Sequence, residues 1–304
     1  MPDTVLILGA RGRFGRHAAA AFAEAGWTVR GLTRGAPAEN VHETVTADAA
    51  DPDAVTRAAE GASVIVQAVN PPYPDWARDL PRFNAALIAA ARAAGATVFL
   101  PGNVYAYGAS MPEVLTEAAP LRPDTRKGRL RAGLEAALRA ETAFQTLVIR
   151  AGDFLDDRAS GNWFDLQIAP PVAKGRVVYP GPLDAVHAWA WLPDLARAAA
   201  ALAGKRAELP RWAAYGLEGF SLTGAELIAA MSRAAGRELR PKGFPWPLIR
   251  LAGLVWPLGR ELAEMRYLWS TPHRIDGAAL AEVLPGFVPT PLDEAMPKAL
   301  APLL

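Results

Sequence analysis

Three glycines spaced three residues apart follow the first apolar run of the chain and constrain its fold more than any other feature. The segment LILGARGRFGRHAAAAFAEAGW places Gly9, Gly12 and Gly15 between an aliphatic run and an alanine-rich helical run. Gly9 permits a tight turn, Gly12 permits close approach of the backbone to a ligand, and Gly15 lets the helix pack on the strand. Because the N-terminus of a helix presents free N–H groups, this turn is typical of a pyrophosphate-binding site.

Short aliphatic runs alternate with alanine-rich helical runs across the first half of the chain. The runs TVLILG, TVRGLT, SVIVQAV, TVFLPG and TLVIRAG lack the regular polar alternation of a sheet that has one face in water. Strands of this kind are covered on both faces by crossover helices. The pattern therefore predicts an α/β fold, a Rossmann-type doubly wound parallel sheet with helices on both faces.

The composition changes after about residue 152. Seven of the nine tryptophans lie beyond that point, and the alternation of strands and helices weakens there. The segment HAWAWLPDLARAAAALAG still indicates a strand or loop followed by a helix. We therefore expect residues 1–152 and about 185–215 to form the dinucleotide-binding domain. Residues 153–184 and 216–304, again with approximate bounds, are expected to form a smaller α/β substrate-binding domain.

Net charge, cysteine content and the N-terminal segment exclude several classes of protein. The 304 residues carry a net charge of +1 with dispersed arginines, which argues against nucleic acid as a partner. The sequence has no cysteine, so disulfides and thiolate metal sites are excluded. The N-terminal segment leads directly into a strand pattern without a basic leader, and we expect a cytoplasmic protein.

The most apolar later stretch is WPLIRLAGLVWPLG, residues 246–259. It is interrupted by Arg250 and Pro257 and falls short of the roughly 20 apolar residues that cross a bilayer, so no membrane span is expected. We interpret the stretch as a core helix, with an oligomer-facing or lipid-facing side as the alternative. The apolar helices are also compatible with a homodimer.

Several further motifs follow the glycine turn in a consistent order. The segments ADAADPDAV, VIVQAVN, VIRAGDF and WAWLPDLARAAAA come in turn along the chain. Together with the spacing G-x-x-G-x-x-G, they resemble the short-chain dehydrogenase/reductase superfamily in its extended and atypical, epimerase-like branches, over most of the chain. The resemblance implies that Asp48 contacts adenine, that VIVQAVN ends along the nicotinamide ribose, that VIRAGDF enters the substrate site, and that Asp194 lies in a return segment. The turn and the resemblance together predict these cofactor-binding residues: Gly9, Arg11, Gly12, Arg13, Phe14, Gly15, Thr33, Arg34, Asp48, Ala49, Ala68, Val69, Asn70, Gly102 and Lys127.

The end of the second expected strand bears on which dinucleotide is bound. VRGLTRG places Thr33 and Arg34 where an NAD-binding chain usually has an acidic residue for the ribose 2′-hydroxyl. An arginine there can pair with a 2′-phosphate and stack on adenine, and Arg11 or Arg13 could add a second positive charge. We therefore expect NADP(H) in preference to NAD(H). The alternative is that Arg34 is simply one of many arginines.

The stretch expected to carry the chemistry departs from the family pattern. The resemblance implies a Ser/Thr before VYG and a downstream Y-x-x-x-K, in which the tyrosine handles the proton. Here LPGNVYAYG aligns Tyr107 with the end of the first motif and puts Asn103 at the Ser/Thr position, where its amide could donate to a substrate oxygen. KGRLRAGLE puts Lys127 at the tyrosine position and Arg131 at the lysine position. Both usual catalytic residues are thus replaced.

The replacement by Lys127 leaves two interpretations open. K-x-x-x-R followed by Glu135 is similar to isoflavone-reductase-like and NmrA-like members, in which a lysine occupies the active-site position. Beside Arg131 and a cationic nicotinamide, like charge and burial disfavour the ammonium, so Lys127 could act as a general acid or base near neutral pH. Otherwise Lys127 only binds the nicotinamide ribose or forms a surface salt bridge. Tyr105 and Tyr107 are further candidate donors, although such tyrosines more often pack or orient a substrate.

Aromatic residues are expected to line the substrate side. The loop NPPYPDWARD would overhang the nicotinamide and offers Tyr73 and Trp76 as lid or substrate contacts. An aromatic and largely uncharged pocket would be completed by Tyr105, Asp153, Phe154, Trp163, Trp189 and Trp191. Such a lining suits a small apolar or aromatic molecule better than a sugar nucleotide. The four histidines lie far apart in sequence, so no metal site is expected.

Three functions are compatible with these features. We expect an NADP(H)-dependent oxidoreductase that acts on a small apolar or aromatic metabolite, with Lys127 handling the proton, Arg131 tuning Lys127, and Asn103 or Tyr107 orienting the substrate oxygen. Among enzymes, the alternative is an epimerase or dehydratase that uses the cofactor transiently. Outside enzymes, the alternative is a non-catalytic NADP(H)-binding regulator that reports redox state to a partner protein.

Overall fold

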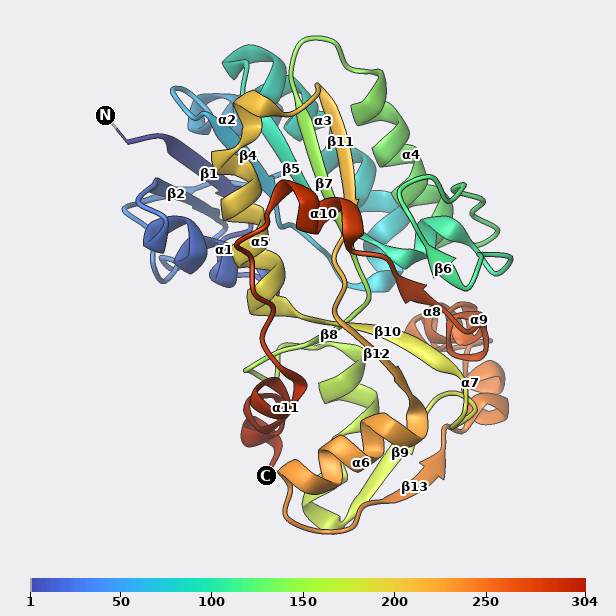
Figure 1. Ribbon diagram of the computed structural model, residues 1–304. Helices are drawn as coiled ribbons and strands as arrows, with labels where there is room; N and C mark the ends of the chain where they lie inside the picture. The colour runs from blue at the N-terminus through green and yellow to red at the C-terminus, as the bar shows by residue number, and fades with distance from the viewer. Residues whose placement is uncertain (1) are drawn as a thin grey trace.

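The computed structural model describes residues 2–304, and a seven-stranded parallel sheet lies at the centre of its larger part (Figure 1). The strand order is β11-β7-β5-β4-β1-β2-β3, and every neighbouring pair is parallel. The strands are β1 (Thr4–Leu8), β2 (Thr28–Thr33), β3 (Glu43–Thr46), β4 (Val64–Gln67), β5 (Thr97–Asn103), β7 (Thr146–Ala151) and β11 (Trp212–Gly216). The doubly wound parallel sheet predicted from the aliphatic runs is confirmed.

Helices cover both faces of this sheet, which explains why inner strands such as β1 and β4 are almost entirely apolar, whereas the edge strand β3 is polar and partly exposed. On one face lie α1 (Arg13–Glu24) and α5 (Leu192–Gly204). On the other lie α2 (Pro52–Ala58), α3 (Trp76–Ala94) and α4 (Arg126–Ala140). Strand β1 shows the division directly, because Val5 and Ile7 pack with α1 and α5 whereas Leu6 and Leu8 pack in the opposite core. Successive side chains of a strand point to opposite faces, so a strand buried on both faces needs apolar residues at every position.

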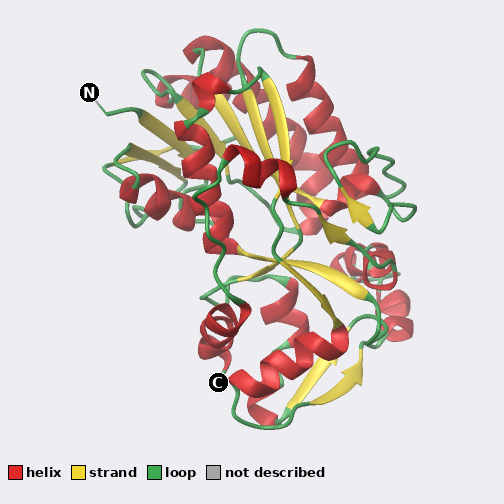
Figure 2. Cartoon of the chain, viewed as in Figure 1, coloured by secondary structure: helices red, strands yellow, loops and turns green. Residues whose placement is uncertain are grey.

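Apart from α10 (Ala278–Val283), which packs on the large sheet beside β11, the rest of the chain forms smaller sheets and short helices beyond the carboxyl ends of the large sheet (Figure 2). A three-stranded sheet has the order β12-β10-β8, with β8 (Asp153–Leu155), β10 (Val186–Trp191) and β12 (Phe220–Thr223). Two strand pairs join β9 (Arg176–Tyr179) to β13 (Arg240–Gly243) and β6 (Val114–Leu115) to β14 (Arg274–Ile275). The remaining helices are α6 (Gly224–Ala234), α7 (Trp246–Ala252), α8 (Pro257–Glu264), α9 (Arg266–Ser270) and α11 (Leu292–Leu300).

The apolar stretch 246–259 does not form the core helix that its composition indicates. It forms α7 and the start of α8, and its side chains Leu248, Leu251, Leu254, Val255 and Trp256 are exposed. The interpretation as a core helix is therefore wrong, because hydropathy alone does not tell which apolar side chains find a partner inside the fold. Among the described residues, no helix is long and apolar enough to cross a membrane.

Candidate active site

The glycine turn joins β1 to α1 and leaves an open helix N-terminus. Gly9 has φ of +77°, a conformation that favours glycine, and Gly12 is the N-cap of α1, where no side chain caps the helix. A Cβ on Gly15 would lie 2.2 Å from the carbonyl oxygen of Gly9, so only glycine fits there. A Cβ on Gly9 would meet the Val69 side chain at 3.1 Å, which places the turn beside the end of β4. The free N–H groups of α1 therefore face a cradle that is shaped for an anion.

Arg11, Arg13 and Phe14, the other residues predicted at the turn, lie in three different environments. Arg11 is exposed, whereas Phe14 is buried and stacks on Phe99 with ring centres 6.1 Å apart. Arg13 donates from Nη1 to the side chain of Asn162 at 3.0 Å. Phe14 is therefore a packing residue that fixes α1 on the sheet, and Arg13 links the turn to the loop after β8.

The ends of β2 and β3 lie side by side at the edge of the sheet. Thr33 and Thr46 are register partners, Thr33 is buried, and Arg34 follows it with an exposed side chain. Asp48 is exposed after β3, and its carboxylate accepts from the backbone N–H of Ala50 at 2.9 Å. Ala49 beside it is buried. The arginine and the aspartate expected at the adenosine end of a dinucleotide thus flank one edge of the sheet.

Arg131 connects α4 to the end of β4. Its Nη2 donates to Oδ1 of Asn70 at 2.8 Å, and its guanidinium carbon lies 4.3 Å from the centre of the Trp76 ring. The Nε atom of Arg131 is buried and has no partner within the protein. A buried donor without a partner is costly unless a ligand binds it. Arg131 therefore keeps one unpartnered donor beside Asn70 and Trp76.

Lys127 is fully buried at the start of α4 and is held by helix α8. Thr125 caps α4 by accepting from the Gly128 N–H at 3.0 Å, which fixes the helix turn that carries the lysine. The Lys127 Nζ lies 2.5 Å from Oε2 and 3.0 Å from the carbonyl oxygen of Glu261, and 3.1 Å from Oε2 of Glu264. An ammonium has three N–H donors, so all of them have a partner on α8.

The environment of Glu261 shows which interaction dominates this contact. Burial by itself raises the pKa of the carboxyl group, but its bonds to Lys127 and Arg126 outweigh burial and lower the pKa. Glu261 therefore stays ionised at neutral pH and pairs with both cations. The sequence signal for this contact was weak, since only the i,i+3 spacing of Glu261 and Glu264 puts two carboxylates on one helix face.

Two tyrosines form a phenol pair next to Lys127. The hydroxyls of Tyr73 and Tyr105 are 2.9 Å apart, and the Lys127 ammonium lies 5.2 Å from the centre of the Tyr73 ring. Burial raises the pKa of both phenols, so both keep their protons at neutral pH. The Trp76 ring packs against both tyrosines, at 5.1 Å from Tyr73 and 6.3 Å from Tyr105. The lid residues and Tyr105 expected on the substrate side thus meet around the lysine.

Asn103 bonds to the backbone of Tyr105, whereas Tyr107 contacts the side chain of Arg150. Asn103 ends β5, and its Oδ1 accepts from the Tyr105 N–H at 3.1 Å, which leaves its Nδ2 as a donor. Tyr107 contacts Arg150, whose Nη1 lies 3.4 Å from the phenol oxygen. Arg150 in turn pairs with Glu135 of α4, with 2.6 Å between Nη2 and Oε2. The Glu135–Arg150 ion pair is buried and fixes α4 against β7. Tyr107 contacts this structural ion pair through Arg150.

Gly102 lies next to the same arginine. It is buried near the end of β5, where a Cβ would lie 2.8 Å from Cγ of Arg150 and 3.3 Å from its Cα. Gly102 therefore allows β5 and β7 to pack closely at this point.

Only some of the aromatic residues predicted for the pocket in the second half of the chain lie together in one cluster. Trp163 packs against Trp269 with ring centres 5.2 Å apart, and Trp189 lies 5.8 Å from Trp269. Phe154 packs instead against the core under α1 and α5. Trp191 is buried, and Asp194 accepts from the backbone N–H and hydroxyl of Thr290, at 2.6 and 2.8 Å. Trp163 and Trp189 therefore join one aromatic cluster, whereas Phe154 does not.

Asp153 pairs with a histidine that the sequence did not single out as a site residue. Its Oδ2 lies 2.9 Å from Nε2 of His187, and both side chains are buried. His187 stacks on Trp269 with ring centres 4.3 Å apart. The negative charge of Asp153 also contributes to the raised pKa of Tyr73 and Tyr105, so Asp153 lies near the phenol pair. The pair of Asp153 and His187 was hidden in the sequence because 34 residues separate its members.

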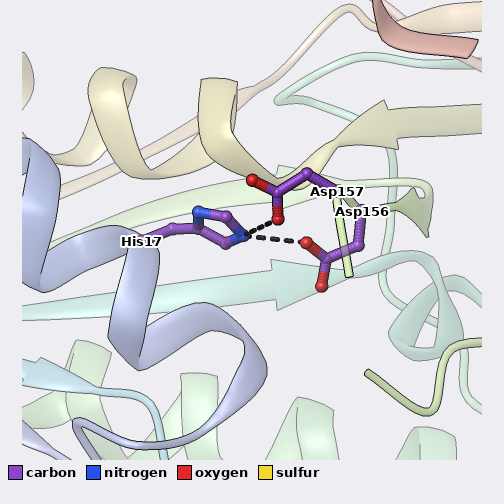
Figure 3. A group of neighbouring side chains, drawn as sticks. All are labelled: His17, Asp156 and Asp157. Carbon is purple, nitrogen blue, oxygen red and sulfur yellow. Dashed lines mark hydrogen bonds and ion pairs between the residues drawn. The ribbon is translucent and has the colours of Figure 1, made fainter. Parts of the chain in front are cut away.

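A second polar cluster ties the loop after β8 to α1. Figure 3 shows His17 of α1 directed at Asp156 and Asp157, with Nε2 at 2.8 Å and 3.5 Å from their carboxylates. Arg16 also binds Asp156, at 2.6 Å. Burial would raise the pKa of Asp156, but its bonds to His17, Ser160 and Arg16 outweigh burial and lower it. The cluster is an ion-pair network in which Arg16 supplies the positive charge, and it holds the loop near the glycine turn.

Comparison with known families identifies the family to which the chain belongs. The chain matches the profile of a family described as NAD(P)H-binding over residues 9–164, from Gly9 through the whole of α4. The chain belongs to this NAD(P)H-binding family. The expectation of a nicotinamide dinucleotide as cofactor is confirmed at the level of the family, and the turn, the end of β4 and α4 all lie within the matched residues. No curated protein matches the chain.

Solved structures extend the likeness over the full length. A GalE-like L-threonine dehydrogenase from Cupriavidus necator is 19% identical with a TM-score of 0.77, covering 99% of this chain and 100% of that chain. A UDP-glucose 4-epimerase from Brucella ovis in complex with NAD is 17% identical with a TM-score of 0.77, covering 97% and 96%. An L-threonine dehydrogenase from Phytophthora infestans is 17% identical with a TM-score of 0.75, covering 98% of each chain. At these identities the likeness shows the fold, and it confirms the resemblance to the epimerase-like branch at that level.

Proposed function

We propose that this NAD(P)H-binding protein is an NADP(H)-dependent oxidoreductase acting on a small apolar or aromatic metabolite. The observation that carries the proposal is the meeting of Lys127 and the phenol pair of Tyr73 and Tyr105 beside Arg131 and Asn70. These groups lie beyond the carboxyl ends of β4 and β5, where α/β sheets bind their ligands. In this proposal, residues 1–152 and about 185–215 form the domain that binds the cofactor.

The residues present fit a nicotinamide dinucleotide. The N-terminus of α1, where Gly12 is the N-cap and no side chain caps the helix, takes the pyrophosphate. The unpartnered Nε of Arg131 supplies a donor to a ribose hydroxyl beside Asn70. A nicotinamide bound there supplies hydride transfer, and the protein supplies binding, orientation and proton handling.

Arg34 supports NADP(H) over NAD(H). Its side chain is exposed at the end of β2, and no acidic residue stands at that strand end to bind a 2′-hydroxyl. A guanidinium binds a phosphate with two charge-assisted hydrogen bonds, so a 2′-phosphate gains affinity there. Arg11 is also exposed at the glycine turn and adds positive charge at the same end of the sheet.

Lys127 is the proposed proton donor, and helix α8 controls its availability. In the structure every N–H of its ammonium binds α8, so α8 must shift before Lys127 can reach a substrate. Once released, the Lys127 ammonium would donate its proton to the substrate oxygen and become a neutral amine, while a bound NADPH would supply the hydride that turns the carbonyl group into an alcohol. Asn103 orients the oxygen through its free Nδ2 donor, a role for which Tyr107 is less suited because it contacts Arg150.

The substrate side supports an apolar or aromatic molecule. Tyr73 lies against the lysine ammonium, Trp76 packs on both Tyr73 and Tyr105, and the nearby carboxylate of Asp153 is paired with His187. A diphosphate would call for unpaired cations. The cations at this point, Lys127 and Arg131, already bind Glu261, Glu264 and Asn70.

One observation favours a second function. Since all three donors of Lys127 are engaged by α8, the closed arrangement also suits a non-catalytic NADP(H)-binding regulator in which cofactor binding alone alters α8. Such a regulator would need no substrate. It would bind oxidised and reduced cofactor with different affinities.

The proposal is tested by following NADPH absorbance with a panel of ketones, enones, imines and quinones. A reductase consumes NADPH in proportion to the product formed. An epimerase or dehydratase would convert a substrate without net loss of cofactor. This result would contradict the proposed oxidoreductase function. Tight NADPH binding without turnover of any of these compounds would favour the regulator.

A further inference from the structure

Five exposed apolar side chains lie close together in sequence on the α7–α8 segment, residues 246–264. These residues are Leu248, Leu251, Leu254, Val255 and Trp256, and we call them the apolar tip. Leu254 is 81% exposed and Val255 is 89% exposed. Large apolar side chains are commonly exposed one at a time, but five within nine consecutive residues make a patch that needs a partner. Figure 1 shows α7 and α8 at an outer edge of the molecule.

The exposure does not come from a loosely attached segment. The Trp246 indole donates to the carbonyl oxygen of Pro180 at 2.7 Å in a buried contact, which anchors the start of α7. Glycines bring the two helices together, since a Cβ on Gly259 would lie 2.7 Å from the Trp256 ring and 3.2 Å from the Gly253 nitrogen. The inner face of α8 binds Lys127 through Glu261. The segment is thus a packed hairpin whose outer face presents the apolar tip.

Within residues 240–266, the exposed charged side chains are all cationic. The exposed charged side chains of residues 240–266 are Arg240, Lys242, Arg250, Arg260 and Arg266. The acidic residues of this range are Glu261, which is buried, and Glu264, which is half-buried, and both face Lys127. The segment therefore carries the apolar tip with exposed cations before, within and after it in the sequence, and no exposed carboxylate between residues 240 and 266.

We propose that the α7–α8 segment docks on an anionic membrane surface. The apolar tip would enter the boundary between headgroups and acyl chains, and the five cations would pair with lipid phosphates. Leucine and tryptophan on one side with arginine and lysine beside them is the composition of interfacial helices. No span of the bilayer is involved.

The same charges argue against a second copy of this chain as the occupant. A two-fold interface places the same patch of both copies face to face. The five cations of one tip would then lie against the five of the other, without exposed carboxylates in residues 240–266 to balance them. An anionic lipid surface balances them directly.

Docking would also act on the active site, a consequence that rests on the proposed function. The hairpin that carries the apolar tip carries Glu261 and Glu264, which engage Lys127. A shift of the hairpin on the membrane would release the lysine and open the aromatic site toward the lipid, where apolar substrates concentrate. Turnover of an apolar substrate would then rise when anionic vesicles are added.

The test is co-sedimentation of the full chain with vesicles, which needs no turnover. We expect at least about tenfold tighter binding to vesicles of phosphatidylcholine mixed with phosphatidylglycerol than to phosphatidylcholine alone, and weaker binding at high salt. The double substitution Leu254→Ser with Val255→Ser should abolish binding, and Arg250→Glu should weaken it several-fold. Val288→Ser is the matched control, because Val288 is 72% exposed outside the segment. NADPH affinity and the unfolding midpoint, measured in parallel, establish that each variant folds.

Three results would overturn the proposal. The first is equal or absent binding to both kinds of vesicle, and the second is unchanged binding in the double variant. The third is concentration-dependent dimerisation in sedimentation velocity that the double variant abolishes, which would assign the tip to a second copy. If NADPH turnover is not found while vesicle binding behaves as expected, the proposed enzymatic function fails and the docking surface stands.

Discussion

The ammonium of Lys127 and the carboxylate of Glu261 form a buried ion pair across 134 residues of sequence, with 2.5 Å between Nζ and Oε2. Neither side chain is more than 1% exposed. The pair joins α4, which covers one face of the large sheet, to α8 of the α7–α8 segment. In the proposed function, the same contact also controls whether Lys127 can reach a substrate.

Removing the charge of Glu261 should destabilise the protein. Glu261→Gln leaves Lys127 with Glu264 as its only carboxylate, and breaking one side of a buried pair costs about 3 kcal/mol. Urea unfolding should show this loss as a lower midpoint. Glu141→Gln is the matched control, because Glu141 pairs with Arg92 near the surface and its loss should change the midpoint little. Equal effects of the two substitutions would contradict the assignment of Glu261 to a buried pair.

Substitution of Arg34 should separate the two dinucleotides. Arg34→Ala should weaken NADPH binding about 10- to 100-fold, the worth of charge-assisted bonds to a phosphate, and leave NADH binding nearly unchanged. Fluorescence titration of both reduced cofactors measures this directly. Arg57→Ala removes an exposed cation of α2 and controls for net charge. A parallel loss of NADH affinity in Arg34→Ala would show that Arg34 does not read the 2′-phosphate.

Two glycine substitutions should have opposite effects. Gly15→Ala forces a Cβ to within 2.2 Å of the Gly9 carbonyl oxygen, so α1 must move away from β1. We expect a loss of NADPH affinity of more than about tenfold and a lower unfolding midpoint. Gly133→Ala in α4 meets nothing within 4 Å and should stabilise the protein by about 0.5–1 kcal/mol. NADPH affinity retained in Gly15→Ala would contradict the role assigned to the turn.

His273 should contribute to the loss of stability in mild acid. Burial, with the nearby His187 as a second cause, lowers the pKa of His273 to about 3 from its ordinary value of 6.5. The unfolded chain therefore binds a proton that the folded chain does not, and this contribution is complete above pH 6.5 and declines as the pH falls toward 3. Its slope is at most about 1.4 kcal/mol per pH unit. Urea midpoints between roughly pH 4.5 and 6.5 should fall less steeply in His273→Phe than in the natural chain; identical slopes would refute the assignment.

Local patterns in the sequence were sufficient to predict the sheet and the turn. The apolar runs contain strands β1, β2, β4, β5 and β7, because strands buried on both faces cannot alternate. The glycine turn was equally readable, since the close approach of Gly15 to Gly9 excludes other residues. The position of Lys127 and Arg131 where the usual tyrosine and lysine are expected was implied by the resemblance to the short-chain dehydrogenase/reductase superfamily.

Contacts between distant segments could not be predicted in the same way. The surroundings expected for Lys127 were Arg131 and the cofactor, whereas its nearest charges belong to Glu261 and Glu264. That contact depends on how α8 folds back over α4, which no local pattern encodes. The burial of the apolar run 246–259 could not be predicted either. Hydropathy measures the tendency of a side chain to leave water, and it does not say whether the fold or a partner covers that side chain.

The central claim is that Lys127 transfers the proton in a reaction that uses NADP(H). The most direct test compares kcat/KM for an identified substrate in the natural chain and in Lys127→Arg, with NADPH affinity measured for both. Arginine keeps the positive charge beside Glu261 and Glu264 but does not release a proton near neutral pH. The account predicts a fall in kcat/KM of at least about 100-fold, with NADPH affinity changed by less than about threefold. Turnover that survives in Lys127→Arg would contradict the claim and leave Lys127 as a residue that only holds α8 in place.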